Sequence, residues 1–180
     1  MEPADNLDQT LWKARGGDRD AFAVLVREHQ SMVFSIAWNY LHNEGAAEEL
    51  AQEVFLDLFQ NVRSIQSPAH LKFWLRKITT HRCIDYTRRR RNKPGVALED
   101  APEPVTVPSM PDPFLAGTLR KLTASLPEKP RMVVILRFQE DMDPSEIAAV
   151  LEMPLNTVKS HLQRSLAVLK EKLERTKVRT

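Results

Sequence analysis

The stretch that decides the fold of the carboxy-terminal half is DPSEIAAVLEMPLNTVKSHLQRSLAVLK, residues 143–170. Asp143, Pro144 and Glu146 have the chemistry of a helix start: aspartate accepts backbone N–H groups, proline suits the first turn, and glutamate reaches back to the cap. The apolar spacing then predicts a short helix, a turn around Glu152-Met153-Pro154, and a longer basic helix. This order of elements is typical of a helix-turn-helix.

If the second of these helices lies in a DNA major groove, the exposed side chains of its first turns meet base edges. Hydroxyl and amide groups donate and accept hydrogen bonds there, whereas lysine and arginine suit phosphate or guanine. A plain helical hairpin is the alternative, but the face left open by Val158, Leu162 and Leu166 is polar. The candidate residues for reading duplex DNA are Asn156, Thr157, Lys159, Ser160, His161 and Arg164.

A run of prolines divides the chain. Six prolines fall between residues 94 and 113, together with several acidic residues. Such a segment cannot bury a core, so we predict an extended Pro-rich acidic linker over residues 94–112. The flanking parts, residues 1–93 and 113–180, carry apolar residues at helical spacing. The predicted fold is all-α, with two small helical domains joined by this linker.

Breaks at Gly16-Gly17 and at residues 43–45 divide the first part into helices. Three long helices with short connections should pack as a bundle. They are predicted from about Arg19 (capped by Asp18) to Leu41, from about Ala46 to Val62, and from Ser67-Pro68 into the run Arg88–Arg91. In the second part, further helices are predicted over about 114–126 and 127–138.

Charge is distributed unevenly along the chain. Residues 1–62 carry 4 Lys/Arg and 11 Asp/Glu, whereas residues 63–93 carry 10 Lys/Arg and one acid. The basic segment points to a polyanion and the acidic one to a different partner, although a solvated helix face is the simpler alternative. Basic side chains interleaved with aromatic ones from Phe73 to Lys93 suit nucleic acid with exposed bases. Trp74, at helical spacing, is more often a core residue than a stacking platform.

Several classes of function are disfavoured. The single cysteine, Cys83, forms no internal disulfide and no Cys-based metal site, and the histidines lack metal-ligand spacing. There is no Gly-rich phosphate loop and no nucleophile with an evident base, so we expect no enzyme, no metal and no cofactor. The longest apolar run, Val133–Leu136, is far too short to span a membrane, and the amino terminus is unlike a secretory signal. A soluble cytoplasmic protein is expected.

The first part resembles region two of the extracytoplasmic-function (ECF) sigma factors, in the sigma-70 family. The resemblance lies in GDRDAF at residues 17–22, AEELAQEVF at 47–55, and FWLRKI at 73–78 with Ile84-Asp85-Tyr86 and the arginines after it. The second part resembles region four of the same family. Its motifs are Leu126-Pro127 with Leu136-Arg137-Phe138, then Glu146-Ile147-Ala148, then PLNTVKSHLQR at residues 154–164. The resemblance covers roughly residues 9–175.

This resemblance implies a sigma factor that directs core RNA polymerase to specific promoters and promotes DNA melting without ATP. Region two (1–93) would bind the clamp helices of the largest subunit and recognise the minus-ten element. Region four (113–180) would bind the flap of the second-largest subunit and read the minus-thirty-five element as duplex. Core polymerase would contact Glu49, Gln52, Glu53 and Phe55, and minus-ten DNA would contact Lys72, Trp74, Lys77, His81, Arg88 and Arg89. An anti-sigma protein is a further expected partner.

Two positions depart from the family pattern. Members often have asparagine where this chain has His81, and glycine where it has Glu152. The main alternative function is a stand-alone helix-turn-helix transcriptional regulator, which usually dimerises and carries a sensor domain. A weaker alternative is attachment to a membrane surface through the basic helix. An acid-rich helix beside a basic one favours the sigma factor.

Overall fold

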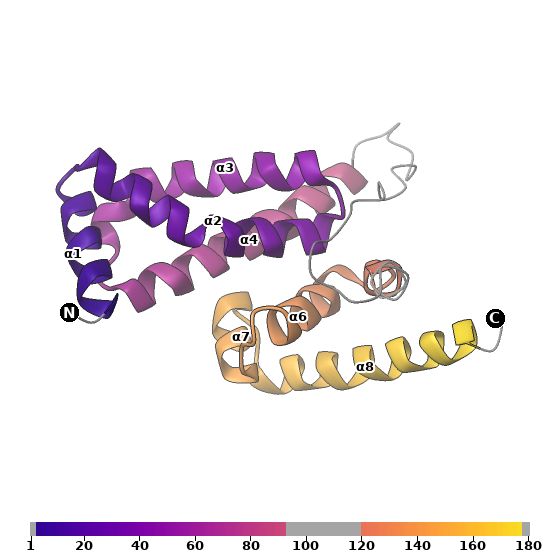
Figure 1. Ribbon diagram of the computed structural model, residues 1–180. Coiled ribbons are helices and arrows are strands. Elements are labelled where there is room, and N and C mark those ends of the chain that lie inside the picture. Colours follow the sequence, from indigo (N-terminus) through magenta and orange to yellow (C-terminus); the bar gives the residue numbers. More distant parts are fainter. Residues whose placement is uncertain (1–2, 93–119, 178–180) are drawn as a thin grey trace.

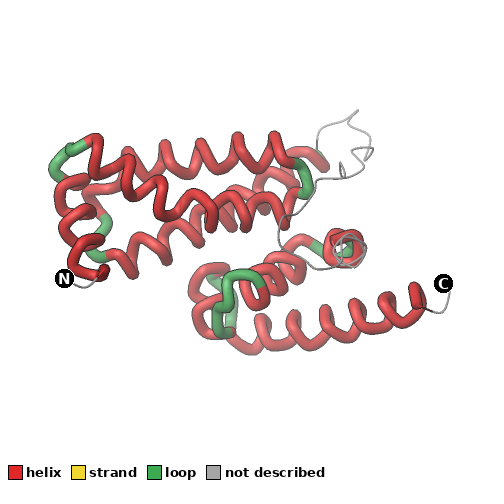
Figure 2. The backbone as a smooth tube through the Cα atoms, viewed as in Figure 1, coloured by secondary structure: helices red, strands yellow, loops and turns green. Residues whose placement is uncertain are grey.

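The structure, a computed structural model, describes residues 3–92 and 120–177, with the side chains of residues 7–92 and 120–175. These segments form helices joined by short connections and contain no strand (Figures 1 and 2). The all-α prediction is confirmed. The predicted linker, residues 94–112, lies outside the described residues, as does most of the helix predicted over 114–126, of which residues 120–124 are helical.

The described residues form two helical units. The first unit holds the three predicted helices and one more, α1, that the sequence analysis did not anticipate. In order, it contains α1 (Pro3–Arg15), α2 (Arg19–Leu41), α3 (Glu44–Asn61), a 3-10 turn η1 (Val62–Ser64) and α4 (Pro68–Arg91). The second unit contains the helical residues 120–124, α6 (Glu128–Phe138), α7 (Pro144–Leu151) and α8 (Leu155–Lys177).

Local capping chemistry sets where the long helices of the first unit begin. Asp18 Oδ1 accepts the backbone N–H groups of Asp20 and Ala21 at 2.9 and 3.0 Å, so α2 begins directly after it. Ser67 Oγ accepts the N–H of His70 at 3.1 Å, and proline follows Ser67 at the first helical position of α4. Side-chain acceptors at these positions satisfy N–H groups that have no partner inside the helix. Both predicted starts are confirmed.

The core of the first unit lies between α2, α3 and α4. Leu25, Ile36, Leu58 and Leu71 are fully buried there. Each such side chain contributes roughly 1.5–3 kcal/mol through removal of apolar surface from water. Helix α1 lies across one end of the bundle (Figure 1) and adds Leu11 to this core.

The second unit begins its helix-turn-helix with the predicted capping box. Asp143 Oδ1 accepts the N–H groups of Ser145 and Glu146 at 2.7 and 3.0 Å, and the Glu146 carboxylate accepts the Asp143 N–H at 2.8 Å. Helix α7 ends at Leu151, and its C-cap residue, Glu152, has a left-handed backbone with φ of 53°. Val158, fully buried, anchors the start of α8.

Helix α6 is covered on more than one side. Five consecutive residues, Met132 to Leu136, are buried, and five consecutive positions cannot share one face of a helix. A helix whose apolar residues are buried on more than one face needs more than one neighbour. Helix α6 contacts α7 and α8 within its own unit and also α2 and α4 of the first unit. The two units are therefore packed together through α6 and α7.

Candidate nucleic-acid and polymerase interfaces

The predicted duplex-reading residues lie on one polar face of α8. Asn156, Lys159, Ser160 and Arg164 are exposed, at spacings of three and four residues that place them on one side of a helix. Thr157 and His161 flank this face and are partly buried. The structure thus brings all six predicted residues together, and the side chains that meet solvent are donors and acceptors of the kind that read base edges.

The turn before α8 fixes how this face is presented. The Met153 N–H donates to the Ala148 carbonyl oxygen at 3.0 Å, which closes α7. The Thr157 and Val158 N–H groups donate to the Pro154 carbonyl oxygen at 2.9 and 3.2 Å, which opens α8. Local hydrogen bonds on both sides of the turn therefore fix where α7 ends and where α8 begins.

His161 has an electrostatic property suited to hydrogen bonding. Partial burial lowers the pKa of its imidazole, and the positive charges of Arg164 and Lys129 lower it further. A neutral imidazole has one donor and one acceptor nitrogen. His161 is therefore equipped to pair with either kind of group on a base edge.

The six residues predicted to contact minus-ten DNA lie along α4, but they do not form one open surface. Lys72, Arg88 and Arg89 are exposed. Trp74 is partly buried and packs against the core, the role that its helical spacing favours. Lys77 and His81, which lie further along α4, contact the second unit. Lys77 Nζ lies 2.8 Å from Glu152 Oε1, and His81 Nε2 lies 3.1 Å from the Val150 carbonyl oxygen.

The acidic face of α3 is partly engaged within the chain. Glu49 and Gln52 are exposed, and Phe55 is half-buried against the core. Glu53 pairs with Arg82 of α4, whose guanidinium also lies 2.6 Å from Asp57 Oδ2. Glu53 therefore ties α3 to α4 in addition to facing solvent, with 54% of its side chain exposed.

Two apolar residues on the same helix were missed by sequence reasoning. Leu56 and Phe59 are 63% and 57% exposed, whereas most large apolar side chains of the first unit are buried. Leu56 follows Glu49, Gln52 and Glu53 at helical spacing on the outward face. The signal was present: an apolar residue on a polar stripe indicates a contact surface rather than a core position.

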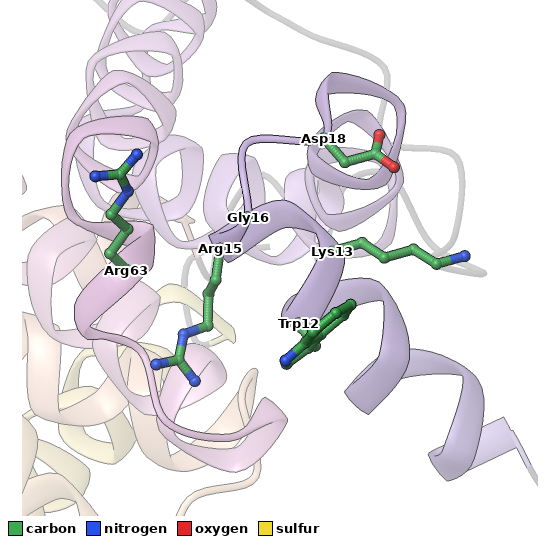
Figure 3. Close-up of a pocket in the computed structure, with 6 residues that line it drawn as sticks. All are labelled: Trp12, Lys13, Arg15, Gly16, Asp18 and Arg63. Carbon is green, nitrogen blue, oxygen red and sulfur yellow. The ribbon is translucent and has the colours of Figure 1, made fainter.

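A shallow hollow lies where α1 meets the turn to α2, beside Arg63 of η1 (Figure 3). It is lined by Trp12, Lys13, Arg15, Gly16, Asp18 and Arg63. Trp12 is 74% exposed. In Figure 3, however, the Lys13 side chain points away from Arg15 and Arg63, so these cations do not converge on one point.

Family models match both units in the expected order. The model of sigma-70 region 2 matches residues 25–93, and that of sigma-70 region 4 matches residues 116–169. The ECF RNA polymerase sigma factor SigE of Mycolicibacterium smegmatis is 32% identical over 96% of this chain and 70% of its own length. The chain belongs to the ECF RNA polymerase sigma factors. This sigma factor directs core RNA polymerase to promoters. Its membership of this family excludes the alternative function, a stand-alone transcriptional regulator.

Other relatives span nearly the whole sigma factor. SigW of Bacillus subtilis is 28% identical, covering 93% of this chain and 96% of SigW, and the sigma-E factor of Escherichia coli is 27% identical, covering 93% and 94%. Among solved structures, CnrH in complex with the cytosolic domain of CnrY superposes with a TM-score of 0.70 at 20% identity, covering 94% of this chain and 98% of that one. RpoE of Bartonella quintana in complex with the anti-sigma factor NepR gives 0.72 at 20%, covering 85% and 96%. These likenesses show the shared fold.

Two further findings concern other classes of site. Among the residues that the structure describes, no group of three or more His, Cys, Asp or Glu is placed to hold a metal ion. No helix in the described segments of this sigma factor is long and apolar enough to cross a membrane.

Proposed function

We propose that α8 reads the minus-thirty-five element as duplex DNA, within a region-four domain over residues 113–180. The observation that carries this proposal is the outward polar face of α8, while Val158 and Leu162 of the same helix pack inward. Lys159 and Arg164 supply positive charge for phosphate or guanine, and the smaller Asn156 and Ser160 permit close approach.

Helix α4 is the proposed minus-ten surface, within a region-two domain over residues 1–93. Lys72, Arg88 and Arg89 are open to solvent and suit backbone phosphates. Lys77, His81 and the edge of Trp74 lie between them and would hold an unstacked base of the non-template strand. Capture of such a base offsets the cost of unpairing, so melting proceeds by binding energy alone.

Helix α3 is the proposed docking surface for the clamp helices of the polymerase. Glu49, Gln52 and Glu53 give it an acidic character that suits a basic partner surface. Phe55 lies half-buried behind them, and the exposed Leu56 and Phe59 add apolar area to the same helix. Charged residues around exposed apolar ones are typical of a protein interface.

We further propose that an anti-sigma protein binds this chain, since the folds of CnrH and of RpoE from Bartonella quintana were solved with CnrY and the anti-sigma factor NepR. The chain acts as a subunit without catalysis of its own, in the cytoplasm beside the polymerase. Polymerase itself supplies the chemistry of RNA synthesis.

The test is transcription by reconstituted enzyme. The full chain is mixed with bacterial core RNA polymerase, the complex is purified, and start sites are mapped on a genomic fragment library. New and specific start sites are expected, sharing two sequence elements upstream. Wild-type start sites from a chain carrying Lys159→Ala and Arg164→Ala would overturn the assignment of α8. Lys170→Ala, an exposed change on the same helix beyond the recognition face, is the matched control.

A further inference from the structure

Helix α1 carries a large apolar side chain in solvent at one end of the first unit. Trp12 is 74% exposed, whereas Trp38 and Trp74 pack against the core. The indole of Trp12 borders the hollow shown in Figure 3 and a second, smaller one along α1. A single exposed apolar residue is common on protein surfaces, so the groups around Trp12 decide what it can bind.

The surroundings of Trp12 are positively charged. Lys13 and Arg15 on α1 and Arg63 in η1 are all exposed and line the same hollow. In the part of the chain that the structure describes, none of these three side chains forms an ion pair. Asp18 also lines the hollow, but its carboxylate caps α2 by accepting two backbone N–H groups. Unpaired positive charge around an indole suits an anionic ligand that has flat, apolar parts.

The cations around Trp12 are spread out. Lys13 points away from Arg15 and Arg63, so the three side chains do not enclose one small anion (Figure 3). Proteins bind single-stranded nucleic acid with cations that follow the backbone and with aromatic side chains that stack on bases. In duplex DNA the base faces are already stacked on one another, so an indole reaches them only in a single strand. The patch therefore fits single-stranded DNA better than a duplex or a small anion.

Exposed cations connect this patch to α4. The 3-10 turn η1 comes directly before α4 in the chain, and α1 contacts both. Exposed basic residues include Arg88 and Arg89 near the end of α4, Lys72 near its start, and then Arg63 and Arg15 beyond the start. The end of α4 leads along the chain to the second unit, which is proposed to read the upstream promoter element. We therefore expect the start of α4, with α1 beside it (Figure 1), to face downstream DNA.

We propose that Trp12, Lys13, Arg15 and Arg63 form a stacking site for the melted non-template strand just downstream of the minus-ten element. We call it the α1 stacking site, and it rests on the placement of minus-ten recognition on α4. The indole stacks on the face of a base and the three cations bind phosphates, so the site accepts any base sequence. Because only melted DNA offers base faces, binding here favours the melted state over the duplex.

The experiment uses core RNA polymerase in complex with the full chain, and fork-shaped DNAs made from a promoter found in the fragment library. Each DNA has an upstream duplex and a single-stranded, non-template minus-ten element. The short probe ends with that element, and the long probe continues for about six nucleotides, within the usual site size of single-strand-binding domains. An abasic probe has the same continuation without bases, so it keeps the phosphates and offers nothing to stack on. Dissociation constants are measured by fluorescence anisotropy.

Trp12→Ala should raise the dissociation constant of the long probe about tenfold, the size expected when one base–aromatic stack is lost. The short and abasic probes should keep their wild-type values, and Trp12→Phe should restore most of the affinity because phenylalanine also stacks. Arg15→Ala with Arg63→Ala should weaken the long and abasic probes alike, since both carry phosphates there. All three side chains are exposed, so these variants should keep the wild-type urea midpoint.

Three results would overturn the proposal. One is wild-type affinity of Trp12→Ala for the long probe. Another is an equal loss on the long and abasic probes, which would mean that Trp12 does not stack on bases. The last is a loss on the short probe, which would place Trp12 against polymerase or against the minus-ten element itself.

A further variant separates the α1 stacking site from the proposed function. Lys72→Ala with Lys77→Ala should weaken the short and long probes together. If it does so and Trp12→Ala weakens neither, α4 keeps minus-ten recognition and the α1 stacking site is rejected. If it leaves both probes at wild-type affinity, minus-ten recognition does not lie on this part of α4, and the stacking site that rests on it is rejected as well.

Discussion

The guanidinium carbon of Arg131, on α6, lies 5.2 Å from the centroid of the Tyr40 ring at the end of α2. The same group donates a hydrogen bond to the Tyr40 carbonyl oxygen at 3.3 Å, and to the carbonyl oxygens of Ala124 and Leu126 at 2.6 and 3.0 Å. One side chain thus joins the first unit, the segment before α6, and α6 itself.

Arg131→Met should therefore destabilise the chain. Methionine keeps much of the apolar stem but leaves three carbonyl groups without their donor, and hydrogen bonds to a charged group are among the stronger ones. We expect the free energy of unfolding to fall by roughly 2–3 kcal/mol, measured by urea denaturation. Arg175→Met is the control: its pair with Glu171 is exposed, and its loss should cost less than about 0.5 kcal/mol. Equal losses in the two variants would refute the joining role.

Contacts between residues far apart in the sequence cannot be predicted from it, whereas the helix caps, which involve neighbouring residues, could be. Asp18, Ser67 and Asp143 were recognisable as caps because each acts on N–H groups two or three residues ahead. Tyr40 and Arg131 are ninety-one residues apart, and no pattern in the sequence pairs them. The contact between Glu152 and Lys77 could not be predicted either, although the sequence shows that Glu152 stands where glycine is common in this turn.

Helix α1 was missed for a different reason. Its buried residues are few: among its described side chains only Leu11 and Ala14 are fully on the inner side, whereas Trp12, Lys13 and Arg15 are exposed. Two buried positions form too narrow an apolar stripe to predict a helix, and the Gly16-Gly17 break directly after it favours a loop. The polar face of α8 could be predicted because Val158 and Leu162, which pack inward, define it by exclusion, although Leu166 of the same predicted stripe is 46% exposed. The exposed Leu56 and Phe59 could not be told from core residues by their type, because apolar residues usually lie in the core.

His42 should make stability depend on pH. Burial lowers the pKa of its imidazole to about 4, with Arg131 and Arg120 adding to the effect. Neither ring nitrogen has a hydrogen-bond partner among the described residues. In the unfolded chain the pKa of this imidazole is near 6.5, so between pH 6.5 and 4 the unfolded chain binds a proton there and the folded chain does not. Stability from this group is therefore complete above pH 6.5 and is lost as pH falls from 6.5 toward 4.

The variant that tests this is His42→Asn. Asparagine does not titrate and tolerates the left-handed backbone of this position, where φ is 54°. Between pH 6.5 and 4, urea denaturation should show a smaller loss of stability in the variant than in the wild type. An NMR titration of the wild type should show a neutral His42 ring at pH 5. Identical pH profiles for the two chains would contradict the assignment.

Charge reversal on α3 should separate two roles that the sequence presents as one. Glu49→Lys changes an exposed residue and should weaken binding to core polymerase without changing the urea midpoint. Glu53→Lys should weaken binding and also lower stability, because it turns the pair with Arg82 into a repulsion. Binding is measured by competition against labelled wild-type chain. Unchanged affinity in both variants would remove α3 from the polymerase interface.

Cys83 offers a way to follow unfolding of the first unit. Its thiol is fully buried on α4, on the stripe that also holds Leu71 and Leu75, and burial raises its pKa well above the usual range. Because the thiolate is the reactive form, a thiol reagent such as dithionitrobenzoate should react only after α4 leaves the first-unit core. The rate should rise with urea in parallel with unfolding. Fast labelling in buffer, before any urea is added, would contradict the burial of Cys83 in the folded chain.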